Sequence, residues 1–456
     1  MNKTIIKHSK VFLSVAVMST AIVTSTGSMA KDVSDENEMV LDEVTVVGTR
    51  RTIQNSIDVK RTSATIVDAL SSDDIGDIPA LSIGEALETL TGASSHRENG
   101  GATEISIRGL GPFLGSTVIN GREATNGSGD RSVNFSQFPS ELFNKIAIYK
   151  TQSASFIEGG VAGQISLETI KPLDHGKRSI QLQAKAAYNP DEQNIDNNAR
   201  DIGYRGTASY IDQFEFENGG KLGVSIGLQT NATTNPEQEA ITSGTPRLCG
   251  LGADGQVLTS GNCDSGDGSL DLSSAEGAAQ PFVATTSSRT FRQNTTSDER
   301  ESVFAAVQWQ PNDRLDINFD AQLSERIAEE DRRDLVFSEA RRGIENLVSD
   351  NGVVRSYSNE GRIESISTDF ERVEEYQGFG INFDYQLSDR LSVALDASYS
   401  NTRREETDVE VRLRSDNDYS SDRVPTVYDL YPNGSDVPLI TVTEFDVTDA
   451  SQFTNS

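Results

Sequence analysis

The sequence predicts a small α+β domain followed by an antiparallel β-barrel of the membrane-spanning type. Residues 63–173 mix helix and strand patterns, whereas several later segments alternate apolar and polar residues. Alternation with a period of two predicts strands with one apolar and one polar face. Short turns that alternate with long hydrophilic segments complete the barrel pattern.

Composition limits the classes of function. A chain of 456 residues predicts at least two structural units. The chain has 70 acidic and 40 basic residues, which gives a formal net charge of -30. This balance argues against a nucleic-acid partner, because a phosphate backbone requires basic patches. Only 35% of the residues are hydrophobic, which argues against a helical membrane protein but does not test a barrel.

Residues 1–30 have the pattern of a secretory signal peptide. Three lysines precede the apolar run Val11–Val23, and small residues lead to a cleavage site after Ala30. A single membrane anchor is the weaker alternative, because the apolar run is too short to span a bilayer. The mature protein is therefore expected to be exported.

Two cysteines, Cys249 and Cys263, lie in a glycine-rich stretch. In an oxidising compartment they can form a disulfide, and closing that loop would contribute ~3 kcal/mol. A zinc site is a poorer interpretation, because no histidine lies near the two thiols. The acidic stretch that begins at Cys263 lacks the spacing of a calcium-binding EF-hand loop. We therefore predict a disulfide and no metal site.

Residues 31–62 are expected to be a flexible segment. The stretch DEVTVVG at 42–48 interrupts this polar sequence with three valines. A β-prone island on a flexible tether is a candidate for pairing with the edge of another protein's sheet. The alternative is the ordinary first strand of a domain.

The stretch SIGEALETLTG predicts a compact helix in the α+β domain. Ser82 is the expected N-cap, Glu85 completes a capping box and Gly92 ends the helix. Asn120-Gly121 predicts a tight turn. Strands are expected in SATIVDAL, TEISIRG, STVING, FNKIAIYK and GQISLETI.

The glycine loop at Gly109–Gly115 suggests a phosphate cradle. A dinucleotide site, however, requires a helix to begin at these glycines. Pro112 and the β-prone stretch STVIN follow instead. The loop is therefore interpreted as a hairpin tip.

Beyond residue 177, seven strands are recognisable. The turns PND and LSD join two pairs of them, while the hydrophilic segments 232–300 and 325–375 are interpreted as long loops between hairpins. Strands this long and loops this unequal disfavour a soluble β-sandwich. The small, odd number of strands predicts a fragment that lacks much of the barrel. The strands are expected near Ile180, Tyr204, Leu222, Phe304, Leu315, Ile381 and Leu391.

The order of these elements, with three longer motifs, resembles one family. The motifs are DIGDIPALSIGEALETLTG, ISIRGLGPFLGSTVINGRE and FNKIAIYKTQSASFIEGGVAGQISLETIKPLD. The sequence resembles the TonB-dependent receptors of Gram-negative outer membranes. In that resemblance the TonB box consists of Asp42, Glu43, Val44, Thr45, Val46, Val47 and Gly48.

The resemblance implies an α+β plug domain, residues 63–173, inside a transmembrane antiparallel β-barrel. The barrel has 22 strands in the family, and residues 174–456 would be its N-terminal part. The implied function is import of an extracellular nutrient, driven by TonB, which an inner-membrane complex energises. The implied surroundings are outer-membrane lipid.

The motifs IRGLGP, NGR and EGG of the plug resemble those of the subgroup associated with oligosaccharide uptake. A receptor for siderophores or other metal chelates is the alternative within the same architecture, and a passive porin or adhesin-like barrel is the alternative from another class. Fold alone does not decide the substrate. The resemblance places three loops at the plug apex: His96–Gly101, Gly111–Ser116 and Ala124–Phe135. The ligand-contact candidates on these loops are Arg97, Asn99, Phe113, Asn126 and Arg131.

Arg108 and Glu158 are the charged residues of two plug-like motifs. We expect them to lock plug to barrel by charge-assisted hydrogen bonds, against the alternative of a solvated face. After removal of the signal, only His96 and His175 remain, and neither lies in a catalytic motif. We therefore expect no enzyme activity and no cofactor.

Overall fold

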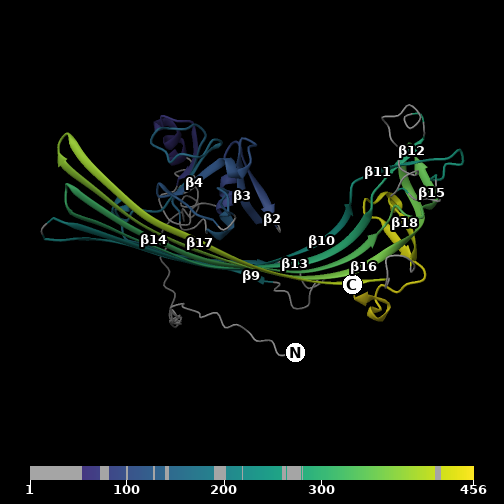
Figure 1. The fold of residues 1–456 in the computed structure, drawn as a ribbon. Helices are drawn as coiled ribbons and strands as arrows, with labels where there is room; N and C mark the ends of the chain where they lie inside the picture. Colours follow the sequence, from purple (N-terminus) through teal and green to yellow (C-terminus); the bar gives the residue numbers. More distant parts are fainter. Residues whose placement is uncertain are drawn as a thin grey trace, which may run out of the picture. The chain divides into compact units, whose positions relative to one another are not determined.

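The structure is a computed structural model, shown in Figure 1. It describes residues 54–71, 82–98, 101–126, 129–138, 143–188, 202–217, 219–258, 263, 279, 281–415 and 423–455. The expected signal peptide, the stretch 42–48, Asn99 and most of the acidic stretch after Cys263 lie outside these residues. Among the described helices, none is long and apolar enough to cross a membrane.

The N-terminal part is an α+β unit built on a five-stranded sheet with the order β1-β6-β7-β4-β5. Strands β4 and β7 are parallel, and the other neighbours are antiparallel. A separate hairpin pairs β2 with β3. The elements are β1 Val67–Ser71, α2 Ile83–Glu88, β2 Ala93–Glu98, β3 Gly101–Ile107, η1 Pro112–Leu114, β4 Gly115–Ile119, β5 Arg122–Glu123, η2 Phe135–Gln137, β6 Lys145–Tyr149, β7 Gly163–Glu168 and α3 Pro172–His175.

Local sequence explains these elements. The Ser82 side chain accepts a hydrogen bond from the Glu85 amide at 3.2 Å and caps α2, as predicted. Gly92 has a φ of 76°, which is the left-handed conformation of a helix stop. Asn120 and Gly121 also have positive φ and form the predicted tight turn after β4. A short 3-10 turn, η1, and then strand β4 follow the glycine loop. The interpretation of this loop as a hairpin tip is wrong, because β3 pairs with β2 whereas β4 pairs with β5 and β7 in another sheet.

Residues 54–62 form a helix within the segment expected to be flexible. This helix contacts β1 directly: the Ser71 amide donates to Ser56 Oγ at 3.2 Å, and Lys60 forms an ion pair with Asp68. Val59 packs against the buried pair Val67 and Ala147. Ordered structure therefore begins before residue 63.

The C-terminal part is an 11-stranded sheet that is strongly curved (Figure 1). Its long neighbours run β8-β9-β10-β13-β14-β16-β17, all antiparallel. These seven strands are the seven predicted from alternation. They span β8 Ser179–Tyr188, β9 Ile202–Glu215, β10 Lys221–Ser243, β13 Ser288–Asn312, β14 Leu315–Ser338, β16 Val353–Ser388 and β17 Leu391–Arg414.

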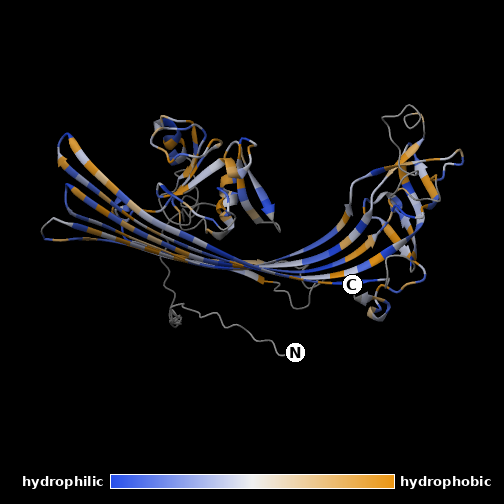
Figure 2. Ribbon diagram, in the orientation of Figure 1, coloured by the Kyte–Doolittle hydropathy of each residue, from blue (hydrophilic) through white to orange (hydrophobic). Residues whose placement is uncertain are grey.

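The two faces of this sheet differ in character, and Figure 2 shows the alternation along the strands. We call the face that contacts the α+β unit the inner face. On β13, β14, β16 and β17 it carries even-numbered residues, such as Gln322 and Tyr376. The outer face carries exposed apolar side chains near the short turns, including Val307, Trp309, Phe319, Leu323, Phe379, Ile381, Val393, Leu395 and Tyr399.

The predicted bounds of the long loops, 232–300 and 325–375, are wrong, because the strands extend far into both segments. Strand β10 continues to Ser243 and β13 begins at Ser288, while only residues 339–352 separate β14 from β16. These strand extensions remain paired residue by residue although both of their faces are largely polar. Hydropathy could not separate them from loops, because cross-strand hydrogen bonds satisfy the backbone whatever the side chains are.

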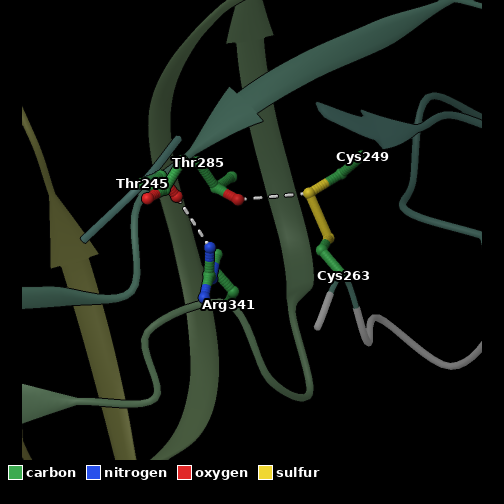
Figure 3. Close-up of a disulfide and its surroundings, with 5 residues drawn as sticks. All are labelled: Thr245, Cys249, Cys263, Thr285 and Arg341. Atoms are coloured by element: carbon green, nitrogen blue, oxygen red, sulfur yellow. Dashed lines mark hydrogen bonds between the residues drawn. A yellow bond between two sulfur atoms is a disulfide. The ribbon is translucent and has the colours of Figure 1, made fainter. Parts of the chain in front are cut away.

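Beyond the long strands, the connections fold into a module with its own apolar core. Tyr357 and Tyr428 stack there with ring centroids 4.6 Å apart. Cys249 and Cys263 form a disulfide in this core, with their Cα atoms 5.4 Å apart (Figure 3). The shorter strands are β11 Arg247–Gly250, β12 Phe282–Thr285, β15 Glu345–Asp350, β18 Val424–Asp429, β19 Leu439–Val442 and β20 Thr454–Asn455, with η5 Pro432–Gly434 and η6 Ala450–Gln452.

The disulfide is anchored to the β14–β16 connection. The Cys263 amide donates to the Arg341 carbonyl at 3.1 Å. Arg341 Nη1 in turn donates to the Thr245 carbonyl at 2.9 Å, which joins two connections (Figure 3). The disulfide thus closes a loop within a packed module.

We predict that replacing both cysteines by serine loosens this module locally. Loss of the loop closure should cost about 3 kcal/mol, so amides of β11 and β12 should exchange roughly 100-fold faster. Hydrogen exchange measured by mass spectrometry tests this. Wild type treated with a reductant should match the double variant, while β1 and β6 exchange as before. Unchanged exchange in β11 would contradict the prediction.

Candidate functional site

The α+β unit contacts the inner face of the curved sheet at several places, and one of these contacts is centred on Arg122. The tight turn Asn120-Gly121 reverses the chain after β4 and places Arg122 in β5. Arg122 Nε donates to Asp396 Oδ1 at 2.8 Å, and Nη2 donates to Asp396 Oδ2 at 2.9 Å. Its third nitrogen, Nη1, forms an ion pair with Asp320. The guanidinium therefore bridges β17 and β14.

Gly380 on β16 makes room for this bridge. It faces Asp320 across the β14–β16 pair, and its neighbour Asn382 faces Asp396 across the β16–β17 pair. A Cβ atom at Gly380 would lie only 1.8 Å from Arg122 Nη1. The sheet thus forms a notch with a glycine floor and a carboxylate on either side.

Polar neighbours reinforce the notch. Asn120 Nδ2 donates to Asp320 Oδ1 at 3.0 Å. Burial acts to lower the pKa of Arg122, but hydrogen bonds to Asp396 and Asp320 outweigh it and raise that pKa. The guanidinium therefore stays charged at physiological pH while this contact is made.

A second contact lies further from the short turns. Arg326, on the inner face, pairs with Asp298 at 2.6 Å and with Glu374 at 3.0 Å. Asn134 Nδ2 of the α+β unit donates to the same Glu374 at 3.5 Å. The Phe138 ring meets Tyr376 edge to face, with centroids 4.9 Å apart. This contact combines apolar packing with a buried charge network.

A third contact joins the two units along the chain. The Leu173 amide donates to Gln308 Oε1 at 2.9 Å, and Gln213 Nε2 donates to the Pro172 carbonyl at 2.8 Å. A Cβ atom at Gly223 would lie 2.7 Å from Pro172 Cβ, so glycine permits the close approach. The segment that leads into β8 is therefore held against the turn end of the sheet.

Arg108 and Glu158 occupy a different place from the one expected of a lock. Both are exposed, and among the described residues neither forms an ion pair or a side-chain hydrogen bond to the sheet. Arg108 has a φ of 55° and begins the turn after β3, where its amide donates to the Gly92 carbonyl. The observed ion pair to the sheet belongs to Arg122.

The expected ligand contacts do not gather at one end. Arg97 lies near the tip of the β2–β3 hairpin and pairs with Glu88 at 2.6 Å. Phe113, 55% exposed, follows the opposite end of β3. The β2–β3 pairing runs from Arg97 opposite Ala102 to Ala93 opposite Ile107, so Phe113 follows the end of the hairpin that is remote from Arg97. The loops His96–Gly101 and Gly111–Ser116 therefore do not share one apex, because a continuous strand lies between them.

The remaining candidates lie nearer the sheet or pack within the unit. Asn126 is half-buried and follows Thr125, whose hydroxyl lies 2.9 Å from both Thr402 Oγ1 and Ser400 Oγ on β17. The Arg131 guanidinium covers Gly159, where a Cβ atom would lie 1.7 Å from Nη1. Arg131 thus contacts its own unit.

Sequence reasoning missed Arg122 because the stretch NGR indicates only a turn. Its two partners lie 198 and 274 residues further along the chain. One signal was available: Asp320 and Asp396 occupy the polar positions of alternating strands. Nothing in the local pattern distinguishes them from other polar positions on the same face.

An ionic contact also ties the first helix to the α+β sheet. Asp68 on β1 forms ion pairs with Lys60 of that helix and with Lys150 after β6. Burial acts to raise the pKa of Asp68, but the two lysines outweigh it and hold that pKa below its ordinary value. Strand β1 is an edge strand of the sheet, so this contact holds an element with only one paired neighbour.

Two concave surfaces lie on the outer side of the sheet. One, of about 690 Å³, is lined by Phe291, Leu335 and Phe337 together with the segment after β19. The other, of about 600 Å³, is lined mainly by outer-face residues such as Glu329 and Asp369. Neither includes the contacts around Arg122.

Residues 59–164 match the model of the TonB-dependent Receptor Plug Domain. No curated protein matches the sequence. Similar solved structures include the outer membrane transporter YddB from Escherichia coli, with 9% identity over 81% of this chain and 59% of that chain and a TM-score of 0.30.

Two further similar structures are receptors or transporters with iron-related names. The ferric citrate transporter FecA shows 11% identity over 82% of this chain and 74% of its own, with a TM-score of 0.30. A mutant of the ferric enterobactin receptor PfeA from Pseudomonas aeruginosa shows 9% sequence identity over 82% of this chain and 62% of its own, with a TM-score of 0.29. This chain spans 59% of the length of the YddB chain.

Replacing Asp396 by Asn should weaken the attachment of the α+β unit. The change removes the negative charge from a bidentate ion pair whose carboxylate is two-fifths exposed. We therefore expect the free energy of unfolding to fall by roughly 1 kcal/mol. Pulsed thiol labelling of a cysteine introduced at the fully buried Ala147 reports unfolding in urea. Asp384→Asn, on the same face of β16 toward the turn end, is the control. Equal urea midpoints for the two variants would disprove the role of Asp396.

Asp68 should make the stability of β1 depend on pH. Because its folded pKa is lowered, its ion pairs stabilise the fold above the ordinary pKa of ~3.9 and are lost as the pH falls through the folded value. At pH 6, Asp68→Asn should speed amide exchange in β1 roughly threefold, as for an ion pair of ~0.7 kcal/mol. The difference from wild type should shrink toward pH 3. Asp58→Asn removes an exposed ion pair and should leave β1 unchanged; a pH-independent effect of Asp68→Asn would refute the assignment.

The α+β unit matches a plug domain, and the fold of the described chain is this plug domain joined to a curved antiparallel sheet of the half-barrel kind.

Proposed function

We propose that this chain belongs to a TonB-dependent outer-membrane receptor that imports an extracellular nutrient. One observation carries the proposal: a domain that matches the receptor plug is fixed by Arg122 to the polar inner face of a curved sheet. The outer face of that sheet bears apolar side chains that are exposed in the described chain, including Trp309, Phe319 and Leu395. This arrangement suits a barrel wall with lipid outside and a plugged passage inside.

In this proposal TonB binds residues 42–48 by strand addition. Main-chain hydrogen bonds would hold the two strands together, and the chain that links these residues to the plug would supply reach. Force applied there reaches the plug through the helix at residues 54–62 and the Asp68 ion pairs. Passage of a ligand then requires that the plug change its contacts with the inner face, including those of Arg122. No catalytic step is involved.

The proposed nutrient is an oligosaccharide. The support is the motif style of the plug together with a polar inner face, on which Asp316, Asn318 and Asn382 lie toward the turn end. Hydroxyl-rich ligands hydrogen-bond readily to carboxylates and amides. Growth of a knockout and its parent on a panel of glycans, and separately in iron-starved medium, tests this choice. A defect confined to iron limitation would overturn the sugar assignment.

Deleting residues 42–48 should abolish uptake and leave ligand binding to the purified receptor unchanged. The reason is that the deletion removes the site for TonB but no part of the described plug. Uptake by cells and binding in detergent are measured on the same variant. Deleting residues 32–38, seven residues of the same acidic segment, is the matched control and should preserve uptake. Uptake that survives loss of 42–48 would indicate a passive barrel instead.

A further inference from the structure

We propose that a specific part of the inner face binds an uncharged, hydroxyl-rich ligand and does not attract anions. This part, the upper wall, comprises the even-numbered positions of 292–298, 328–334, 366–372 and 406–412. It lies between the plug contacts at Arg326 and Tyr376 and the disulfide-bonded module. The inference rests on the proposed function, since it assumes that the ligand passes along the inner face.

Carboxylates outnumber arginines on the upper wall. Its four arginines are Arg292, Arg332, Arg372 and Arg412, and its six carboxylates are Asp298, Glu330, Asp334, Glu406, Asp408 and Glu410. Two of these carboxylates pair with arginines just outside the upper wall, Asp298 with Arg326 and Glu406 with Arg404. Counted with those partners, the two charges are equal in number, so the wall offers an anion no excess positive charge.

The arginines are also occupied. Arg292 donates two hydrogen bonds to Asp334, of 2.8 and 2.9 Å. Arg372 Nε donates to Glu406 at 2.6 Å, and Arg412 Nη2 donates to Glu410 at 2.9 Å. Arg332 donates to Thr368 at 3.2 Å and lies 3.8 Å from Asp334. An anion could bind Arg292, Arg372 or Arg412 only by displacing a carboxylate that is already hydrogen-bonded there, which costs the energy of the existing pair.

Phe370 is the aromatic residue of the upper wall. Across the strands it faces Glu330 on β14 and Asp408 on β17, and Thr296 on β13 completes the row. The Arg372 guanidinium lies 5.2 Å from its ring centroid and fixes one side. An apolar ring flanked by two hydrogen-bond acceptors matches a sugar ring, which offers C–H groups on its face and hydroxyl donors at its edge.

Adjacent residues on a strand point to opposite faces, so the chain provides matched controls. Glu329 and Glu330 are neighbours on β14, with Glu329 on the outer face and Glu330 on the upper wall. Phe379 lies on β16, like Phe370, but on the outer face near the turn end, where it is 37% exposed. The two substitutions of each pair therefore remove the same kind of side chain from opposite faces of one strand.

The test measures binding to the full-length receptor, purified in detergent, by isothermal titration calorimetry. The probes are maltohexaose, xylohexaose, chitohexaose and ferric citrate. We expect at least one oligosaccharide to bind and ferric citrate not to bind. Phe370→Ala should weaken oligosaccharide binding about tenfold or more, and Glu330→Gln should weaken it about threefold or more. Phe379→Ala and Glu329→Gln should leave it unchanged.

Three outcomes would overturn the inference. These are binding of ferric citrate to the wild type, no binding of any of the three oligosaccharides, or equal effects of Phe370→Ala and Phe379→Ala. Each is distinguishable from failure of the importer proposal, which would appear as uptake that does not require residues 42–48. TonB-dependent uptake of an anionic chelate would retain the importer and reject the upper-wall assignment.

Discussion

The bridge from Arg122 to two carboxylates on separate strands is the interaction on which the arrangement depends. It requires an arginine because a planar guanidinium can serve Asp320 and Asp396 at once, whereas an ammonium is a point charge. It requires Gly380 because a Cβ atom there would occupy the space of Nη1. It also requires neighbouring strands in fixed register, since Asp320 and Asp396 lie on either side of β16.

The second constraint is the two-faced strand. Near the short turns, odd positions on β13, β14, β16 and β17 are apolar and exposed, while even positions meet the plug. Further along the same strands both faces become largely polar, yet pairing continues without interruption from Trp309 to Ser288. The sheet therefore has a band suited to lipid, and beyond it a wall whose inner face can be specialised for a ligand without loss of the fold.

The plug contacts and the upper wall both contain arginine–carboxylate pairs, but the pairs connect different parts of the chain. Around Arg122, charges from two separate parts of the chain meet and hold the plug in place. On the upper wall, charges such as Arg372 and Glu406 neutralise one another within the sheet and leave Phe370 between two acceptors. In the proposed importer, the first arrangement would keep the passage closed, and the second would influence which ligand can approach it.

Sequence by itself determined the local elements and the alternation. The Ser82 cap, the Asn120-Gly121 turn and the seven long strands follow from propensity and period, which act over a few residues. Tertiary structure alone decided that the strands extend through 325–338 and 353–375, that Phe113 and Arg97 lie at opposite ends of β3, and that Arg122 rather than Arg108 or Glu158 forms the ion pair to the sheet. The reason is physical: Arg122 meets its partners across 198 and 274 residues of chain. No local pattern encodes which polar position of which strand will lie opposite it, because that depends on the register of all the strands between.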